Sequence, residues 1–224
     1  MAEKKNMKGA DLEATLEESF IQKNLKKIGI IVGVIIACVV VFLLGRAYLE
    51  KQNDKAAEAL YPSEQLFQNG DYEKALNGDG QDVLGLVQVV KKYGYTKSGN
   101  LAKLYAGLAF ANLEKYEDAA KYLKDFSAKD DEMVSPAAIG ALGNVYVELG
   151  DYDKAVKTLV KAAEKADNPV LSPVFLVQAG EILESQGKAD KALELYEEVK
   201  EKYLSNQQYA DIDKYIERIK VAKK

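Results

Sequence analysis

One uninterrupted apolar segment constrains this chain more than any other feature of its sequence. Residues Ile28 to Gly45 are 18 positions without a charge or a strong hydrogen-bonding side chain. As an α-helix that rises about 1.5 Å per residue, the segment would be about 27 Å long, close to the hydrocarbon thickness of a bilayer. The sequence therefore predicts a transmembrane helix over residues 28–45, a charged leader over residues 1–27 and a polar domain over residues 46–224.

Two kinds of processed signal share features with this segment. A cleaved signal peptide has an apolar core of about 7 to 15 residues and a small-x-small site, which Gly45-Arg46-Ala47 imitates. A lipoprotein signal would use Cys38, which follows an aliphatic-small run. The longer apolar core, the long charged leader and the apolar residues after Cys38 favour an uncleaved anchor. Processing at Cys38 or Ala47 stays open as the alternative.

Basic residues near the apolar segment predict its orientation. Cytoplasmic flanks of a membrane span carry an excess of lysine and arginine, counted within about 15–20 residues of its ends. The lysines before the segment are Lys4, Lys5, Lys8, Lys23, Lys26 and Lys27, and the basic residues shortly after it are Arg46, Lys51 and Lys55. We therefore expect a single-pass protein with a cytoplasmic N-terminus. In a bacterial cell it would lie in the inner membrane, with the polar domain in the periplasm.

The leader and the span each carry a helical pattern. Apolar residues at helical spacing predict an amphipathic helix over residues 11–27. This helix would lie on the inner membrane surface or contact a partner, and the alternative is that it frays in solvent.

Within the span, Gly29, Gly33 and Ala37 fall on one face, where small residues allow two membrane helices to pack closely. Glycine is also simply common in membrane helices. Because Pro62 is the first helix breaker after the span, we expect the helix to continue into the polar domain.

The polar domain repeats a short motif. Similar six-residue sequences begin at residues 70 (GDYEKA), 114 (EKYEDA), 150 (GDYDKA) and 187 (GKADKA). In the three later copies, a glycine stands 12 residues before the last alanine of the motif. These pairs are Gly107 and Ala119, Gly143 and Ala155, and Gly180 and Ala192. The glycines are 36 and 37 residues apart, from 107 to 143 and from 143 to 180.

This pattern resembles the tetratricopeptide repeat, a helix-turn-helix unit of about 34 residues. The resemblance implies an all-α fold, in which the N-terminal transmembrane helix is followed by an α-solenoid of about four helix hairpins and a capping helix. We expect the repeats near residues 56–98, 100–133, 136–169 and 173–206, and the capping helix over residues 208–222. The paired glycines and alanines would let the two helices of a repeat approach closely. Side chains expected to fill the layer between repeats are Tyr146, Tyr152, Leu159 and Ala162.

The first copy departs from this pattern. Ser63 replaces the glycine, and the distance from Ser63 to Gly107 is 44 residues, about eight more than one repeat needs. We expect the insertion around residues 77–80 and 97–100. The glycines of the first stretch lack the preceding strand and following Lys-Ser/Thr of a phosphate-binding loop, so the sequence predicts an ordinary loop there.

Composition argues against catalysis. The chain has no histidine, and its single cysteine lies within the apolar segment. It therefore lacks the usual zinc ligands, the commonest general base and any intramolecular disulfide. No serine has an evident activating partner. We expect no enzyme activity, catalytic residue, metal or cofactor, and the net charge of −4 without a basic stripe argues against nucleic-acid binding.

The first helices of such repeats line a concave face that binds extended or helical polypeptide. By repeat position, the residues expected in this groove are Leu104, Leu108, Asn112, Asn144, Val147, Glu148, Val177, Glu181 and Glu184. Apolar side chains with acids at one end suit hydrophobic or basic segments, although apolar residues at helical spacing are often ordinary core. Relatives that grip a terminal carboxylate use lysine with asparagine. Here the lysine position holds Leu104, Gly140 or Val177, so a carboxylate clamp is not expected.

The complete layout resembles the YfgM-like ancillary subunits of the bacterial Sec translocon. The resemblance implies a non-catalytic scaffold beside the translocation channel. Its partners would be Sec translocon subunits, a membrane-anchored periplasmic prolyl isomerase and translocating polypeptides, which it would hand to periplasmic chaperones. Two alternatives stay open. One is a scaffold for envelope or secretion-system assembly, and the other is an N-anchored import receptor with cytosolic repeats, which the lysine asymmetry and the missing clamp disfavour.

Overall fold

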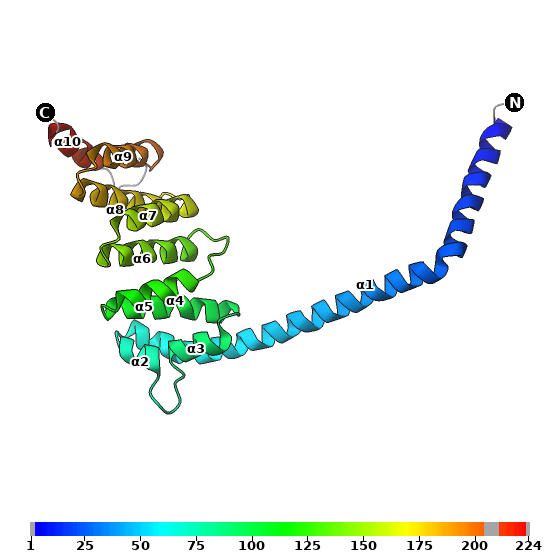
Figure 1. Cartoon of the computed structure of the whole chain (residues 1–224), viewed down its shortest axis with the longest axis horizontal. Helices are drawn as coiled ribbons and strands as arrows, with labels where there is room; N and C mark the ends of the chain where they lie inside the picture. Colours follow the sequence, from blue (N-terminus) through cyan, green and yellow to red (C-terminus); the bar gives the residue numbers. More distant parts are fainter. Residues whose placement is uncertain (1–2, 204–210, 223–224) are drawn as a thin grey trace. The chain divides into compact units, whose positions relative to one another are not determined.

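The computed structural model describes residues 3–203 and 211–222, and the side chains of residues 24–203 and 211–221. The chain separates into two compact units, Met1–Lys51 and Gln52–Lys224. The long helix α1 (Glu3–Gln68) forms the first unit up to Lys51, and the rest of the helix belongs to the second unit. The second unit holds the remaining helices (Figure 1). The expected all-α fold is confirmed.

The part of α1 that covers the predicted span is apolar and exposed. Ile30, Val41 and Leu44 are 67%, 70% and 66% exposed, and the helix is long and apolar enough to cross a membrane. Water solvates such a continuous apolar surface poorly, whereas lipid tails solvate it well. The expected continuation of the helix past Gly45 is also confirmed, because α1 runs to Gln68 with Pro62 inside it. The amphipathic face expected over residues 11–27 depends largely on side chains that lie outside the described residues.

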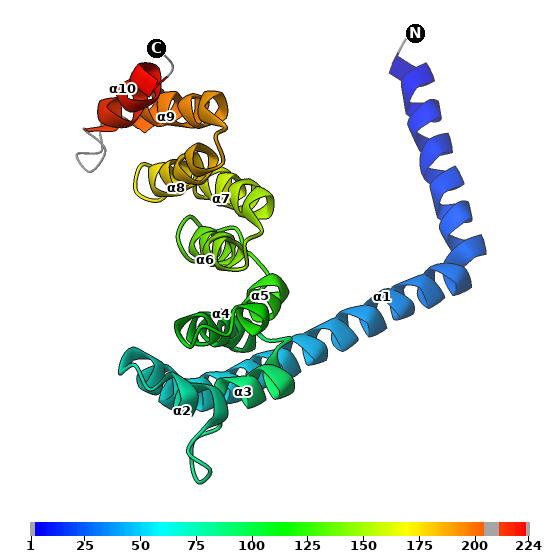
Figure 2. The same cartoon turned by 60° about the vertical axis from the view of Figure 1, so that its left-hand side comes forward.

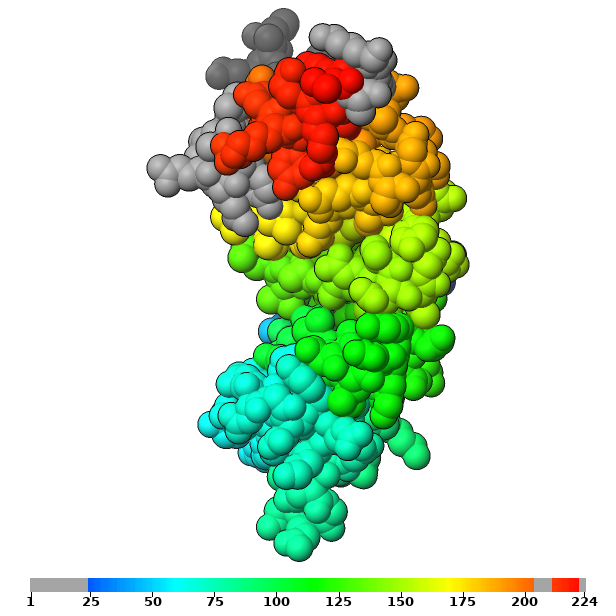
Figure 3. Space-filling view, turned by 90° about the vertical axis from the view of Figure 1, so that its left-hand side faces the viewer, coloured from blue at the N-terminus to red at the C-terminus, as the bar shows by residue number. Residues whose placement is uncertain are grey.

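The second unit is a stack of antiparallel helix hairpins (Figure 1, Figure 2). The end of α1 is followed by two short helices, α2 (Tyr72–Asn77) and α3 (Leu86–Tyr93). Three regular hairpins and a final helix follow: α4 (Lys97–Asn112) with α5 (Tyr116–Asp125), α6 (Val134–Glu148) with α7 (Tyr152–Ala166), α8 (Ser172–Ser185) with α9 (Ala189–Tyr203), and α10 (Ile212–Ala222). Figure 3 shows the hairpins of this unit stacked in chain order.

Three apolar cores lie along the stack, one around α1 to α4, one around α4 to α6 and one around α7 to α10. Ile212, Ile216 and Ile219 of α10 are buried against the last of them, while the neighbouring Asp213, Lys214 and Glu217 are exposed. This helix therefore closes the core with one apolar face and turns charged residues to solvent, as the end of a repeat array requires.

The repeat glycines allow the two helices of each hairpin to approach closely. A Cβ atom at Gly107 would lie 2.6 Å from Leu123 Cγ, one at Gly143 would lie 2.8 Å from Leu159 Cγ, and one at Gly180 would lie 2.4 Å from Tyr196 Cε1. Each of these large side chains comes four residues after the alanine of the motif. The alanines Ala119, Ala155 and Ala192 are fully buried. A Cβ atom at these positions would have to displace the large side chain, so glycine is favoured there.

The turns between paired helices share a left-handed residue. Gly150 and Gly187 have φ angles of 73° and 71°, and Glu114 has the same kind of conformation at 58°. At the first of these turns, Asp151 N–H donates to Tyr146 O and Gly150 N–H donates to Val147 O. This pattern satisfies the carbonyl groups that the end of α6 leaves free. Glu114 adopts the left-handed conformation that usually favours glycine, so this turn keeps its geometry although the residue differs.

An eight-residue loop interrupts the second helix of the first copy. Residues 78–85 leave α2 and return to α3, and an isolated antiparallel bridge between Gly78 and Leu84 closes the loop. The Asp79 carboxylate accepts backbone hydrogen bonds from Gln81 and Val83 at 2.9 and 2.8 Å. Ser63 is fully buried and donates to Leu84 O at 2.8 Å, so the residue that replaces the repeat glycine holds the base of the loop.

The second expected insertion site, residues 97–100, is wrong. These residues form the first turn of α4, and the Thr96 hydroxyl caps that helix by accepting a hydrogen bond from Gly99 N at 3.0 Å. Threonine is a favoured N-cap residue, so Thr96 marks the start of a helix. Residues 97–100 therefore belong to α4 and not to an inserted loop.

Candidate peptide-binding groove

Two adjoining hollows follow the face formed by α4, α6 and α8. The hollow between α4 and α6 has a volume of about 310 Å³, and the hollow between α6 and α8 has a volume of about 500 Å³. Asn144 and Glu148 of α6 line both, so the two hollows form one groove across three first helices. The other lining residues are Leu108, Ala111, Asn112, Tyr116, Ala141 and Val145 in the first hollow, and Val147, Tyr152, Gln178, Glu181, Ile182 and Ser185 in the second.

Six of the nine residues predicted for the groove line it. Leu108, Asn112, Asn144, Val147, Glu148 and Glu181 are brought together there. They are spaced at helical intervals on α4, α6 and α8, so repeat stacking alone places them side by side.

The other three predicted residues lie elsewhere. Leu104 and Val177 are only 9% and 6% exposed and belong to the apolar cores of the stack. Neighbouring helices cover them, so they contribute packing and not a binding surface. Glu184 forms a salt bridge with Arg218 of α10 at 2.7 Å. This pair attaches the capping helix to α8, and Glu184 is absent from the lining of either hollow.

Two tyrosines of the groove were not predicted. Tyr116 and Tyr152 are the first residues of α5 and α7, and each lines one hollow. Tyr152 is 42% exposed, so the expectation that it fills the layer between repeats is wrong. Tyr146, Leu159 and Ala162 are buried. Their positions in the sequence could have indicated this. Tyr116 follows Asn112 by four residues, and Tyr152 follows Glu148 by four residues. The tight turn between the paired helices keeps each tyrosine beside the end of the preceding helix.

Negative charge gathers in the groove. Burial, followed by the charges of Glu148 and Glu114, raises the pKa of the Tyr116 hydroxyl above its ordinary value of 10.0. Glu148 and Glu181 have no salt-bridge partner among the residues that the structure describes. Two uncompensated carboxylates beside Leu108, Val147 and Ile182 suit a ligand that is both apolar and basic.

Apolar, amide, hydroxyl and carboxylate side chains line the groove. No cysteine lines it, and the chain has no histidine. Over residues 24–203 and 211–221, no group of three potential metal-ligating side chains is placed to hold a metal ion. The groove can recognise a chain segment by shape, apolar contact, amide hydrogen bonds and charge.

Stacked helix hairpins with an open first-helix groove define an α-solenoid, a class of protein-interaction module. The tetratricopeptide repeat-like domain family matches residues 19–219, nearly the whole chain. The protein belongs to this family. Such domains are typically non-catalytic and mediate contacts between proteins, so the chain is a protein-binding scaffold. Comparison with curated proteins gives no match.

Proposed function

We propose that this protein is a membrane-anchored scaffold that binds polypeptide segments in the groove across α4, α6 and α8. The observation that carries the proposal is the continuity of the two hollows through Asn144 and Glu148. A groove that crosses three repeats holds several residues of an extended or helical segment at once. Its apolar walls and uncompensated carboxylates favour hydrophobic segments that carry lysine or arginine.

The anchor in this proposal is the apolar part of α1. Its exposed aliphatic surface supports insertion in a bilayer, and the excess of lysine before it supports a cytoplasmic N-terminus. The repeats then lie outside the cytoplasm, in the periplasm of a bacterial cell. A Cβ atom at Gly29 or Gly33 would meet no atom within 4 Å. With Ala37, these positions leave a smooth face on which a partner's membrane helix can pack.

The more specific role is that of an ancillary subunit of the Sec translocon. An anchor beside the channel keeps the groove at high local concentration near polypeptides that emerge from it. The groove then protects their apolar segments until chaperones take over. The partners in this role are translocon subunits, a membrane-anchored periplasmic prolyl isomerase and the translocating chains. The layout of a charged leader, a single span and a repeat domain supports it.

Position-specific photo-crosslinking in bacterial membranes tests this function. A photoreactive phenylalanine analogue replaces Asn144, which is exposed in the groove, or Lys157, which is exposed on α7 and outside both hollows. We expect a secretory chain arrested during translocation to crosslink to position 144 and not to position 157. Crosslinks from position 144 to components of an envelope assembly complex, with none to the arrested chain, would replace the translocon role by an assembly role. No crosslink from position 144 would contradict polypeptide binding in the groove.

A further inference from the structure

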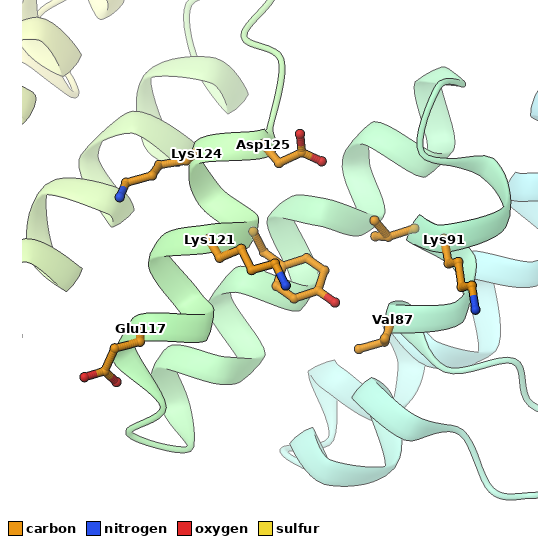
Figure 4. Close-up of a pocket in the computed structure, with 8 residues that line it drawn as sticks. Val87, Lys91, Glu117, Lys121, Lys124 and Asp125 are labelled. Atoms are coloured by element: carbon orange, nitrogen blue, oxygen red, sulfur yellow. The ribbon is translucent and has the colours of Figure 1, made fainter.

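A third hollow lies between α3 and α5 and has a volume of about 750 Å³ (Figure 4). None of its lining residues belongs to the groove across α4, α6 and α8. Its apolar lining consists of Val87 and Val90 of α3 and Tyr122 of α5. We call this hollow the α3–α5 slot. Its volume falls in the range of about 300–1,000 Å³ that is usual for ligand pockets.

Two lysines flank the slot, one on each helix. In Figure 4, Lys91 lies on the α3 side and Lys121 on the α5 side. Both are exposed, and neither has a salt-bridge partner in the described part of the chain. Lys121 Nζ lies 5.9 Å from the ring centre of Tyr122. Neither ammonium group is held in a salt bridge, although the lining also contains the carboxylates of Glu117 and Asp125. Burial and the nearby charge of Asp118 raise the pKa of Tyr122.

The other charged residues of the lining are already engaged or turned away. Asp125 forms a salt bridge with Lys103 at 2.9 Å. Lys124 Nζ lies 5.3 Å from the ring centre of Tyr146, on the opposite side of α5. Figure 4 shows Glu117 and Lys124 extending away from α3. The charged lining of the α3–α5 slot consists of three lysines and two acids and is therefore net positive, whereas the charged lining of the groove across α4, α6 and α8 consists of carboxylates alone.

We propose that the α3–α5 slot docks an acidic amphipathic segment of a protein partner. Apolar side chains of that segment would cover Val87, Val90 and Tyr122, and its carboxylates would pair with Lys91 and Lys121. A recessed apolar floor with two lysines fits a polypeptide better than a membrane surface, because recognition of anionic lipid headgroups typically uses clusters of about 4–8 basic residues. The protein thus carries two docking surfaces of opposite charge preference, and the second does not depend on the groove.

Two designed peptides serve as probes. The acidic probe is a fluorescent amphipathic helix with a leucine face and glutamate elsewhere, and the basic probe carries lysine at the same positions. Binding to the full-length protein in nanodiscs of zwitterionic lipid is followed by fluorescence anisotropy. The variant Lys91→Gln/Lys121→Gln removes both charges of the slot. The matched control Lys157→Gln/Lys161→Gln removes two exposed charges of α7.

We expect the slot variant to bind the acidic probe about five- to tenfold more weakly than the native protein, because two ion pairs next to an apolar contact are lost. Its affinity for the basic probe stays unchanged, and the α7 control binds both probes like the native protein. The affinity for the acidic probe falls as salt is added. Since both lysines are exposed, the circular dichroism spectrum and the unfolding midpoint stay unchanged.

Three results would overturn the proposal. The first is saturable binding of the acidic probe that the slot variant does not weaken. The second is the absence of saturable binding up to about 1 mM. The third is unchanged probe binding together with a loss of binding to vesicles that contain anionic lipid, which would identify the slot as a lipid contact. The groove variant Glu148→Gln/Glu181→Gln separates this proposal from the proposed function, because it should weaken the basic probe alone.

Discussion

Gly143→Ala should destabilise the stack although alanine is the better helix former. The added Cβ would lie 2.8 Å from Leu159 Cγ and 2.9 Å from Leu159 Cδ2. Carbon atoms in contact prefer about 3.5–4.0 Å, so Leu159 has to move by roughly 1 Å. Leu159 is fully buried, and such overpacking costs about 1–3 kcal/mol. Alanine recovers about 0.5–1 kcal/mol of helix propensity. The expected net loss is about 1–2 kcal/mol.

A double-mutant cycle with Leu159→Ala isolates this contact. Leu159→Ala alone should cost about 2–5 kcal/mol because it leaves a cavity. Once the leucine is shortened, the alanine at position 143 no longer meets it, so the double variant should be more stable than the sum of the two single losses predicts. Urea unfolding of the full-length protein in detergent, followed by circular dichroism, measures all three variants. Additive losses, or no loss for Gly143→Ala, would refute the close contact between α6 and α7.

Three further predictions concern other parts of the molecule. Burial and the hydrogen bond to Glu64 raise the pKa of Tyr105 to about 12 from 10.0; neutral Tyr105 therefore contributes stability below pH 10 that is lost as the pH rises toward 12. Alkaline unfolding of Tyr105→Phe should lack this component, and an identical pH profile would contradict it. Ser63→Ala removes the 2.8 Å hydrogen bond to Leu84 O and should cost about 1 kcal/mol. Hydrogen exchange in residues 78–85 should accelerate, and unchanged exchange would count against this anchor. Protease added to intact spheroplasts should digest the repeat domain; digestion only after lysis would contradict the periplasmic orientation.

The repeat register could be predicted from sequence because its determinants are local and chemically strict. Gly107, Gly143 and Gly180 each face a large side chain at a distance that excludes a Cβ, so the same residue recurs at nearly constant spacing. The apolar face of α10 was visible for a similar reason, since Ile212, Ile216 and Ile219 recur at helical spacing. Patterns of this kind depend only on the chain and on one neighbouring helix.

The groove was harder to predict because its boundary depends on the neighbouring repeats. Leu104 and Leu108 are one helical turn apart, yet one is buried in the core and the other lines a hollow. Helical spacing identifies the shared stripe but not the depth at which the next hairpin covers it. Tyr152 was assigned to the layer between repeats by its position in the repeat motif. The structure leaves it 42% exposed at the start of α7.

The α3–α5 slot was not predicted because it brings together separate parts of the chain. Lys91 and Lys121 are 30 residues apart and belong to no shared motif. Their juxtaposition depends on the loop of residues 78–85, which divides the second helix of the first copy and sets where α3 begins. Sequence reasoning located an insertion near this point, but not the helix that follows it.

The most direct test of the central claim is the affinity of the full-length protein for the basic amphipathic probe, measured with and without the groove carboxylates. Glu148→Gln/Glu181→Gln changes charge with little change in side-chain shape, and both residues line the hollow between α6 and α8. If the groove binds polypeptide, the native protein binds the probe saturably and the variant binds it about five- to tenfold more weakly, with unchanged stability. Equal affinity of the two proteins for the probe would contradict polypeptide recognition in this groove.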